Sequence, residues 1–198
     1  MKEIGLNPKS DLQTRLKRLL NLDRALGRKP TETDPAKNTY AFYSADAPGK
    51  GTEVLFSEYE SFALLMGLRL LESPWPQGSV VETLRRIRTE LEREHRRILR
   101  LDKKKLFDKV LIREKANKDG YAATNSQPTF LLIVSDSGTP DQHPSVPYSK
   151  IYQNPIEALR FQLKEVGRFC TWCELVTPAW SLHDHLAATI PRQRGRQG

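Results

Sequence analysis

Apolar residues recur at helical spacing in three stretches of the first hundred residues. The first follows the capping-box pattern that opens at Ser10 and predicts an amphipathic helix that ends near Gly27. The second starts at Ser57 and is apolar around most of its circumference, so we expect a core helix through Leu71. The third, from Ser79 to about Arg100, is heavily charged and has one narrow apolar stripe. The stripe consists of Val80, Leu84, Ile87, Leu91 and Ile98.

Between the first two helices, the pattern favours extended chain on either side of a turn. Tyr40, Phe42 and Tyr43 precede the Gly-rich segment 45–51, and an apolar run ends at Phe56. Aromatic and β-branched residues around a glycine-rich turn are typical of a hairpin. We therefore predict a β-hairpin with Lys50 at its tip.

The rear of the chain has a different pattern. Residues 129–134 are apolar on both faces, which predicts a strand in the middle of a sheet, and residues 136–149 read as a loop. A helix is expected from Asn154, then a second apolar run at 170–176, and a last helix over about 178–188. The predicted fold class is α+β, with a mainly helical N-terminal half that carries the hairpin and a small α/β C-terminal half. The expected regions are 1–101 (helical), 102–128 (basic and polar linker), 129–190 (α/β) and 191–198 (basic tail).

The positive net charge of the chain favours a polyanionic partner. The chain has 32 Lys and Arg against 24 Asp and Glu, a formal net charge of +8. Cations that neutralise phosphates release condensed counterions, although many small proteins are basic without binding nucleic acid. The first helix and the hairpin tip carry the candidate contacts. The predicted nucleic-acid-binding residues are Thr14, Arg15, Lys17, Arg18, Arg24 and Lys50.

The order of a basic helix, a hairpin, an apolar helix and a long charged helix resembles the winged helix-turn-helix domain of MerR-type transcription regulators. The resemblance covers roughly residues 5–100 and implies a DNA-binding regulator without catalytic activity. In it, residues 12–24 would take the place of the recognition helix, residues 40–56 would be the wing, and residues 79–100 would contact a second copy. We therefore expect a homodimer joined by the apolar stripe.

Other kinds of site find less support in the residues. Cys170 and Cys173 with His183 and His185 could supply four zinc ligands, but two histidines two residues apart on a helix point to different sides, so we predict no metal and no cofactor. His95 lies among charged residues and is expected at the surface. An enzyme would need a pocket that unites His143, Asp136 or the cysteines, and no nucleophile motif accompanies them.

Two alternatives to DNA binding stay open. An RNA-binding protein would use the same cations with Tyr40, Phe42 and Tyr43 exposed for base stacking. A helical adaptor would use the long charged helix for a protein partner. No secretion signal or membrane-spanning stretch is expected, and a chain with only two cysteines favours a cytoplasmic location.

Overall fold

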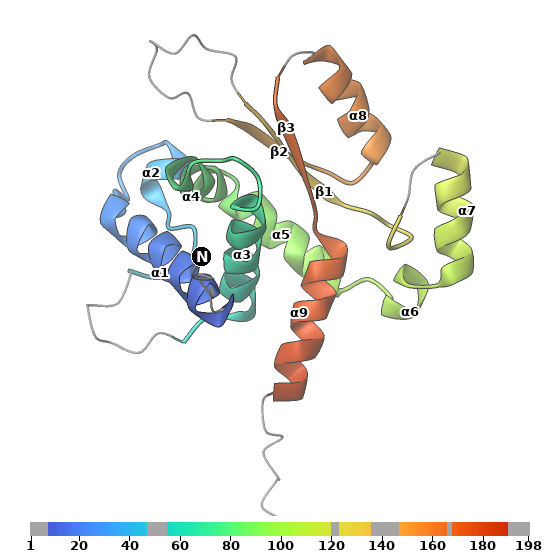
Figure 1. The fold of residues 1–198 in the computed structure, drawn as a ribbon, viewed down its shortest axis with the longest axis horizontal. Coiled ribbons are helices and arrows are strands. Elements are labelled where there is room, and N and C mark those ends of the chain that lie inside the picture. Colours follow the sequence, from blue (N-terminus) through green and yellow to red (C-terminus); the bar gives the residue numbers. More distant parts are fainter. Residues whose placement is uncertain (1–7, 47–54, 120–122, 136–146, 166–167, 190–198) are drawn as a thin grey trace, which may run out of the picture.

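The computed structural model describes residues 8–46, 55–119, 123–135, 147–165 and 168–189, with a group of helices on one side and a small antiparallel sheet on the other (Figure 1). The helices are α1 (Pro8–Leu26), α2 (Pro35–Asn38), α3 (Glu58–Leu70), α4 (Gln77–Arg86), α5 (Arg88–Leu99), α6 (Lys103–Leu106), α7 (Lys109–Asp119), α8 (Pro155–Lys164) and α9 (Val176–Thr189). The strands are β1 (Phe130–Val134), β2 (Tyr148–Tyr152) and β3 (Cys170–Glu174). The chain is thus a mixed helix-and-sheet protein, as predicted.

Local signals in the sequence explain where the front helices begin and end. The Ser57 hydroxyl accepts a hydrogen bond from the Glu60 backbone N–H (3.2 Å), and the Glu60 carboxylate accepts one from the Ser57 N–H (2.6 Å), so the predicted capping box of α3 is confirmed. Helix α1 begins at Pro8, two residues before the predicted cap, because proline is well accommodated in a first helical turn. Gly27 follows α1 with a positive φ of 64°, a conformation that glycine adopts without strain.

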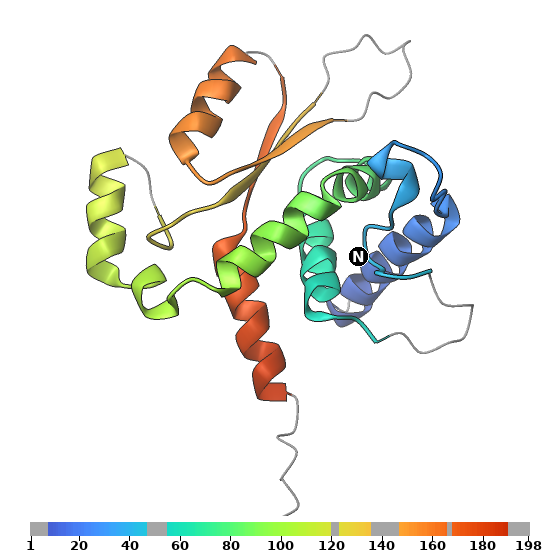
Figure 2. The ribbon, with the colours of Figure 1, turned by 180° about the vertical axis from the view of Figure 1, so that it is seen from behind.

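The third predicted helix is interrupted at Ile87. This residue leaves helical geometry (φ −93°, ψ 4°) and separates α4 from α5, which run in different directions (Figures 1 and 2). The hydrophobic pattern continues across the break, so the sequence did not reveal it. As a result, α4 packs with α1 and α2, whereas α5 reaches towards α9.

The sheet has the order β2-β1-β3, with both neighbours antiparallel to β1. Strand β1 is therefore central, as its apolar residues predicted. Strand β2 was missed because Ser149 and Lys150 interrupt any apolar run in this edge strand. The antiparallel arrangement differs from the parallel sheet usual for an α/β unit.

The two faces of β1 belong to two different packing layers. Leu131 and Ile133 enter the main core, together with residues of α3, α5 and α9, whereas Leu132 and Val134 pack towards α8. Figure 1 shows α8 beyond the sheet, away from the front helices. The main core extends in sequence from Leu19 to Ala179, so the helical region and the sheet region share one core. The segment expected as a linker, 102–128, contains α6 and α7.

The three tryptophans all lie around the sheet and its covering helices. Trp75 donates from Nε1 to the Thr171 hydroxyl of β3 (2.8 Å). Trp172 donates to the Gln162 side chain (2.8 Å) and thereby ties β3 to α8. Trp180 of α9 lies edge-on to His183, and the Lys103 ammonium lies over its ring.

None of the helices in the described ranges has an apolar stretch long enough to cross a bilayer.

Candidate nucleic-acid interface

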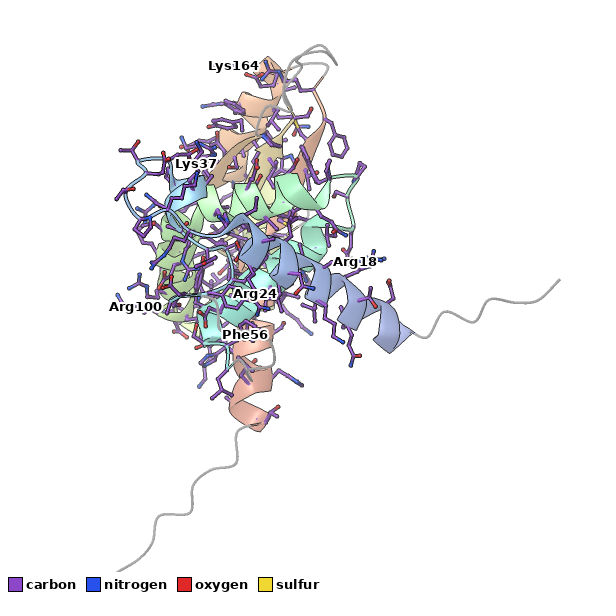
Figure 3. All side chains as sticks on the ribbon, turned by 90° about the vertical axis from the view of Figure 1, so that its left-hand side faces the viewer. Arg18, Arg24, Lys37, Phe56, Arg100 and Lys164 are labelled. Atoms are coloured by element: carbon purple, nitrogen blue, oxygen red, sulfur yellow. The ribbon has the colours of Figure 1, made fainter. Side chains whose placement is uncertain are left out.

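Helix α1 separates its apolar and polar residues on opposite faces. Leu19 and Asp23 are fully buried, and Leu16 and Leu20 pack against the core from the same side. The opposite face is exposed and polar. It carries Thr14, Lys17, Arg18 and Asn21, whose spacing of three and four residues places them on one surface of the helix. Figure 3 shows Arg18 on the outer side of α1, directed away from the body.

A buried ion pair fixes α1 to the rest of the chain. The Asp23 carboxylate receives Arg85 Nε of α4 at 2.6 Å, and both side chains are almost completely buried, at 0% and 1% exposed. The same carboxylate accepts the backbone N–H groups of Ala41 (3.1 Å) and Phe42 (3.0 Å). Arg85 also donates to the backbone carbonyls of Asp23, Gly27 and Ala36. Every charged atom of the pair has partners, as a buried charge requires.

A second buried arginine holds the chain between α2 and α3. Arg88 Nη1 donates to the carbonyls of Tyr40 (2.7 Å) and Ala41 (3.1 Å), and its guanidinium lies over the Tyr59 ring at 5.2 Å. Tyr59 returns a hydrogen bond from its hydroxyl to the Arg88 carbonyl (3.2 Å). Burial raises the pKa of Tyr59, so this phenol stays protonated and donating.

These contacts correct the prediction for the hairpin. Tyr40, Phe42 and Tyr43 are buried in the core, at 9%, 0% and 5% exposed, and residues 40–46 and 55–57 form no strand. The predicted tip, including Lys50, lies outside the described residues. Aromatic rings that fill a core cannot stack on bases, so the RNA-binding alternative loses its proposed contacts.

The predicted cations of α1 have different surroundings. Arg15 forms an ion pair with Asp11 one turn away, at 2.9 Å, and each side chain is a little less than half exposed. Arg24 has its Nε buried, and its positive charge opposes the rise that burial causes in the pKa of Tyr43. Lys17 and Arg18 make no ion pair within the described ranges. The structure therefore brings Thr14, Lys17 and Arg18 together on one face and places Arg15 and Arg24 at its sides.

The predicted dimer stripe occupies a different place from the one expected. All five residues are at most 4% exposed within the single chain, and they form part of its main core. Leu91 and Ile98 are completely buried. These side chains are therefore not presented to a second copy, because α5 packs against α9 of its own chain. The stripe looked unpartnered in the sequence because the elements that cover it are distant along the chain. Helices α1, α2 and α3 pack against α4, and α9 packs against α5.

The cysteines and rear histidines are not arranged as a metal site. Cys170 and Cys173 lie three residues apart on β3, where successive side chains alternate, so Cys173 faces the main core and Cys170 faces the α8 layer. Burial raises the pKa of the Cys173 thiol to about 11. His183 instead bonds Glu58 through Nδ1 (2.7 Å). Among the described residues, no three His, Cys, Asp or Glu side chains are grouped to hold a metal ion.

The prediction that His95 is a surface residue is wrong. Its side chain is 3% exposed, stacks on Phe62 at 4.5 Å and meets the edge of Tyr59. Nε2 has no hydrogen-bond partner in the part of the chain that the structure describes. Burial lowers the pKa of His95, an effect that nearby Glu58 opposes and His183 reinforces. His143 and Asp136, the other candidates for catalysis, lie outside the described residues.

One basic region is larger than the basic and polar linker predicted at 102–128. Residues 93–118 contain eleven Lys and Arg and four Asp and Glu, a net charge of +7, whereas the other 172 residues contain 21 and 20 and contribute +1. We name these cations the basic ridge. They are Arg93, Arg96, Arg97, Arg100, Lys103, Lys104, Lys105, Lys109, Arg113, Lys115 and Lys118. A running charge count along the chain would have found them.

The ridge follows three consecutive helices. Figure 2 shows α5, α6 and α7 continuing one another from the middle of the molecule to its edge. A hollow of about 540 Å³ at the end of α5 is lined by four of the arginines with Glu94 and Leu101. A second hollow, of about 330 Å³, lies between α7 and residues 126–127 and is lined by Lys105, Lys115 and Lys118 among others.

Comparisons with known proteins leave the site to be interpreted from its own residues. No family model matches the chain, and searches of curated proteins and of solved structures likewise gave no match.

Proposed function

We propose that this protein binds DNA through the outer face of α1, as a regulator or architectural protein that acts by binding. The observation that carries the proposal is the exposed row of Lys17, Arg18 and Asn21, beside Thr14, on a helix whose opposite face is fixed in the core. Arginine and asparagine side chains recognise guanine and adenine edges in a major groove, whereas lysine contacts phosphates.

The way α1 is held supports this proposal. A recognition surface works best when its backbone is rigid, because each side chain must meet a base edge within a fraction of an ångström. The Asp23–Arg85 pair and the packing of Leu19 supply that rigidity from the inner face. Gly67 of α3 contributes as well, since it has no side chain where Leu19 approaches, and a Cβ there would lie 3.1 Å from Leu19 Cδ1.

Substitution of the outer face tests the proposal. A duplex selected for tight binding from a random pool serves as the probe, and its affinity is measured by fluorescence anisotropy. Arg18→Ala is expected to weaken binding by about 1–3 kcal/mol and to relax specificity at one base pair, whereas Lys17→Ala should weaken all sequences alike. The matched control is Lys164→Ala on α8, another exposed cation.

Melting temperatures of the same variants distinguish a binding role from a structural one. Both α1 side chains are exposed, so their removal should leave the melting temperature close to that of the native chain. Native affinity in the Lys17→Ala/Arg18→Ala double variant would overturn the assignment of this face.

A further inference from the structure

The basic ridge concentrates nearly all of the net charge, and much of that charge is available to a ligand. Four of its residues have acidic partners: Arg93, Arg96 and Arg97 pair with glutamates of α5, and Lys103 pairs with Asp184. Six others are exposed and form no ion pair within the described ranges. These six are Arg100, Lys104, Lys105, Lys109, Arg113 and Lys118.

The paired residues give the ridge a fixed base. Glu94 is 4% exposed and its Oε2 receives Arg97 Nε at 2.7 Å and Gln153 Nε2 at 3.0 Å. Arg97 also donates from Nη2 to the Thr129 hydroxyl at 2.8 Å. The arginine side of the ridge is thereby attached to Gln153, which follows β2, and to Thr129, which precedes β1. A cationic surface held in this way can bind anions without first ordering all of its side chains.

The composition of α7 favours phosphates of a nucleic acid over a lipid surface. A helix that inserts into a membrane interface gathers its apolar residues on one face. In α7, however, Val110, Leu111 and Ile112 are consecutive, so their side chains spread over more than half of the helix circumference between the cations. A cation-rich surface without a continuous apolar face suits the regularly spaced phosphates of a nucleic-acid backbone.

The ridge and the outer face of α1 lie on different sides of the molecule. In Figures 1 and 2, α1 and α7 occupy opposite ends of the fold. Figure 3, viewed from the side, places Arg18 and Arg100 at opposite sides of the body. A single straight duplex that covers one surface therefore leaves the other exposed.

We propose that the basic ridge is a second nucleic-acid-binding surface, which contacts phosphates without reading sequence, and that one chain bridges two duplex segments. This inference rests on the proposed DNA binding by α1 for the second segment. The ridge supplies most of the salt-dependent affinity, whereas α1 selects the sequence.

Two triple substitutions with the same loss of charge test the ridge. Arg100→Gln/Lys104→Gln/Lys105→Gln removes three unpaired ridge cations, and Lys37→Gln/Arg160→Gln/Lys164→Gln removes three exposed cations from α2 and α8. The affinity for a duplex of random sequence is measured over a series of salt concentrations. The ridge variant should lower the slope of log K against log salt by about 2.7, which corresponds to three phosphate contacts, and the control should leave the slope unchanged.

Bridging is measured with a biotinylated duplex on beads and a second, fluorescent duplex in solution. The native chain should retain the fluorescent duplex, and both the ridge variant and the Lys17→Ala/Arg18→Ala variant should lose that retention. Vesicles of phosphatidylserine and phosphatidylcholine form a parallel arm. Ridge-dependent binding to vesicles but not to duplex would overturn the nucleic-acid assignment.

The outcomes separate the two proposals. If only the α1 variant loses DNA affinity, the ridge inference fails and the function of α1 stands. If only the ridge variant loses affinity, the ridge is the DNA-binding surface and the assignment of α1 fails, as does bridging. Retention of the fluorescent duplex by the ridge variant would show that two copies, rather than two surfaces, join the duplexes.

Discussion

At the scale of single residues, the stability of the front half depends on its buried ionisable side chains. Asp23, Arg85 and Arg88 are buried with hydrogen-bond partners for their charges, whereas the Nε2 of the buried His95 has no partner among the described residues. A neutral imidazole tolerates this environment, but a protonated one would require a partner for each N–H.

His95 should make the stability of the fold depend on pH. Because burial lowers its pKa in the folded chain below the ordinary value of 6.5, the unfolded chain binds its proton first as the pH falls. The contribution of His95 is therefore complete above about pH 6.5 and is lost below it, at up to about 1.4 kcal/mol per pH unit. Urea unfolding between pH 5 and 8 measures this slope.

His95→Phe keeps an aromatic ring against Phe62 and removes the titration. The variant should show a shallower loss of unfolding free energy on the acid side than the native chain. His185→Gln, which removes an exposed histidine of α9, is the control for other titrating groups. An identical slope in the native and His95→Phe chains would show that His95 does not titrate differently on folding.

Between elements, the ion pair of Asp23 and Arg85 connects α1 with α4 and with the chain around Ala41. Asp23→Ala should lower the unfolding free energy by about 3–5 kcal/mol, because it leaves the Arg85 charge buried without its partner. The double variant Asp23→Ala/Arg85→Met should lose less than the sum of the two single variants, since no charge then stays buried. Equal and additive losses would indicate that the pair contributes only packing.

Elements defined by local signals were predictable, and those defined by distant contacts were not. The capping box at Ser57, the central strand at 130–134 and the helix after Asn154 each depend on neighbouring residues, and the structure contains all three. The burial of Arg85, in contrast, depends on partners 49 to 62 residues away. The burial of His95 depends on contacts with α3. The sequence analysis therefore expected this charged helix to contact a second copy and His95 to lie at the surface.

The candidate site was predictable to a similar extent. Thr14, Lys17 and Arg18 share a face because helical periodicity requires it, and this followed from the sequence. The burial of Tyr40 and Phe42 could not be foreseen, since aromatic residues before a turn suit a hairpin as well as a core. The basic ridge can be found by counting charges along the sequence, but only the structure shows which of its cations form ion pairs.

For the molecule as a whole, the stripe on α4 and α5 closes the core of one chain. Leu91→Ala should therefore lower the unfolding free energy by about 2–5 kcal/mol, the usual cost of a buried leucine. The loss should be the same at low and high protein concentration, because unfolding then involves one chain. A loss that grows on dilution would instead assign the stripe to an interface. The homodimer itself stays a prediction, which light scattering can test.

The placement of the tryptophans has a spectroscopic consequence. Trp75, Trp172 and Trp180 lie at the sheet, α8 and α9, and each has a defined polar or aromatic neighbour. Intrinsic fluorescence will thus follow unfolding of the sheet layer, with Trp180 and the Lys103 beside it as the closest emitter to the ridge. Neither α1 nor α7 contains a tryptophan, so a dye on α1 is needed to observe the opposite end of the molecule.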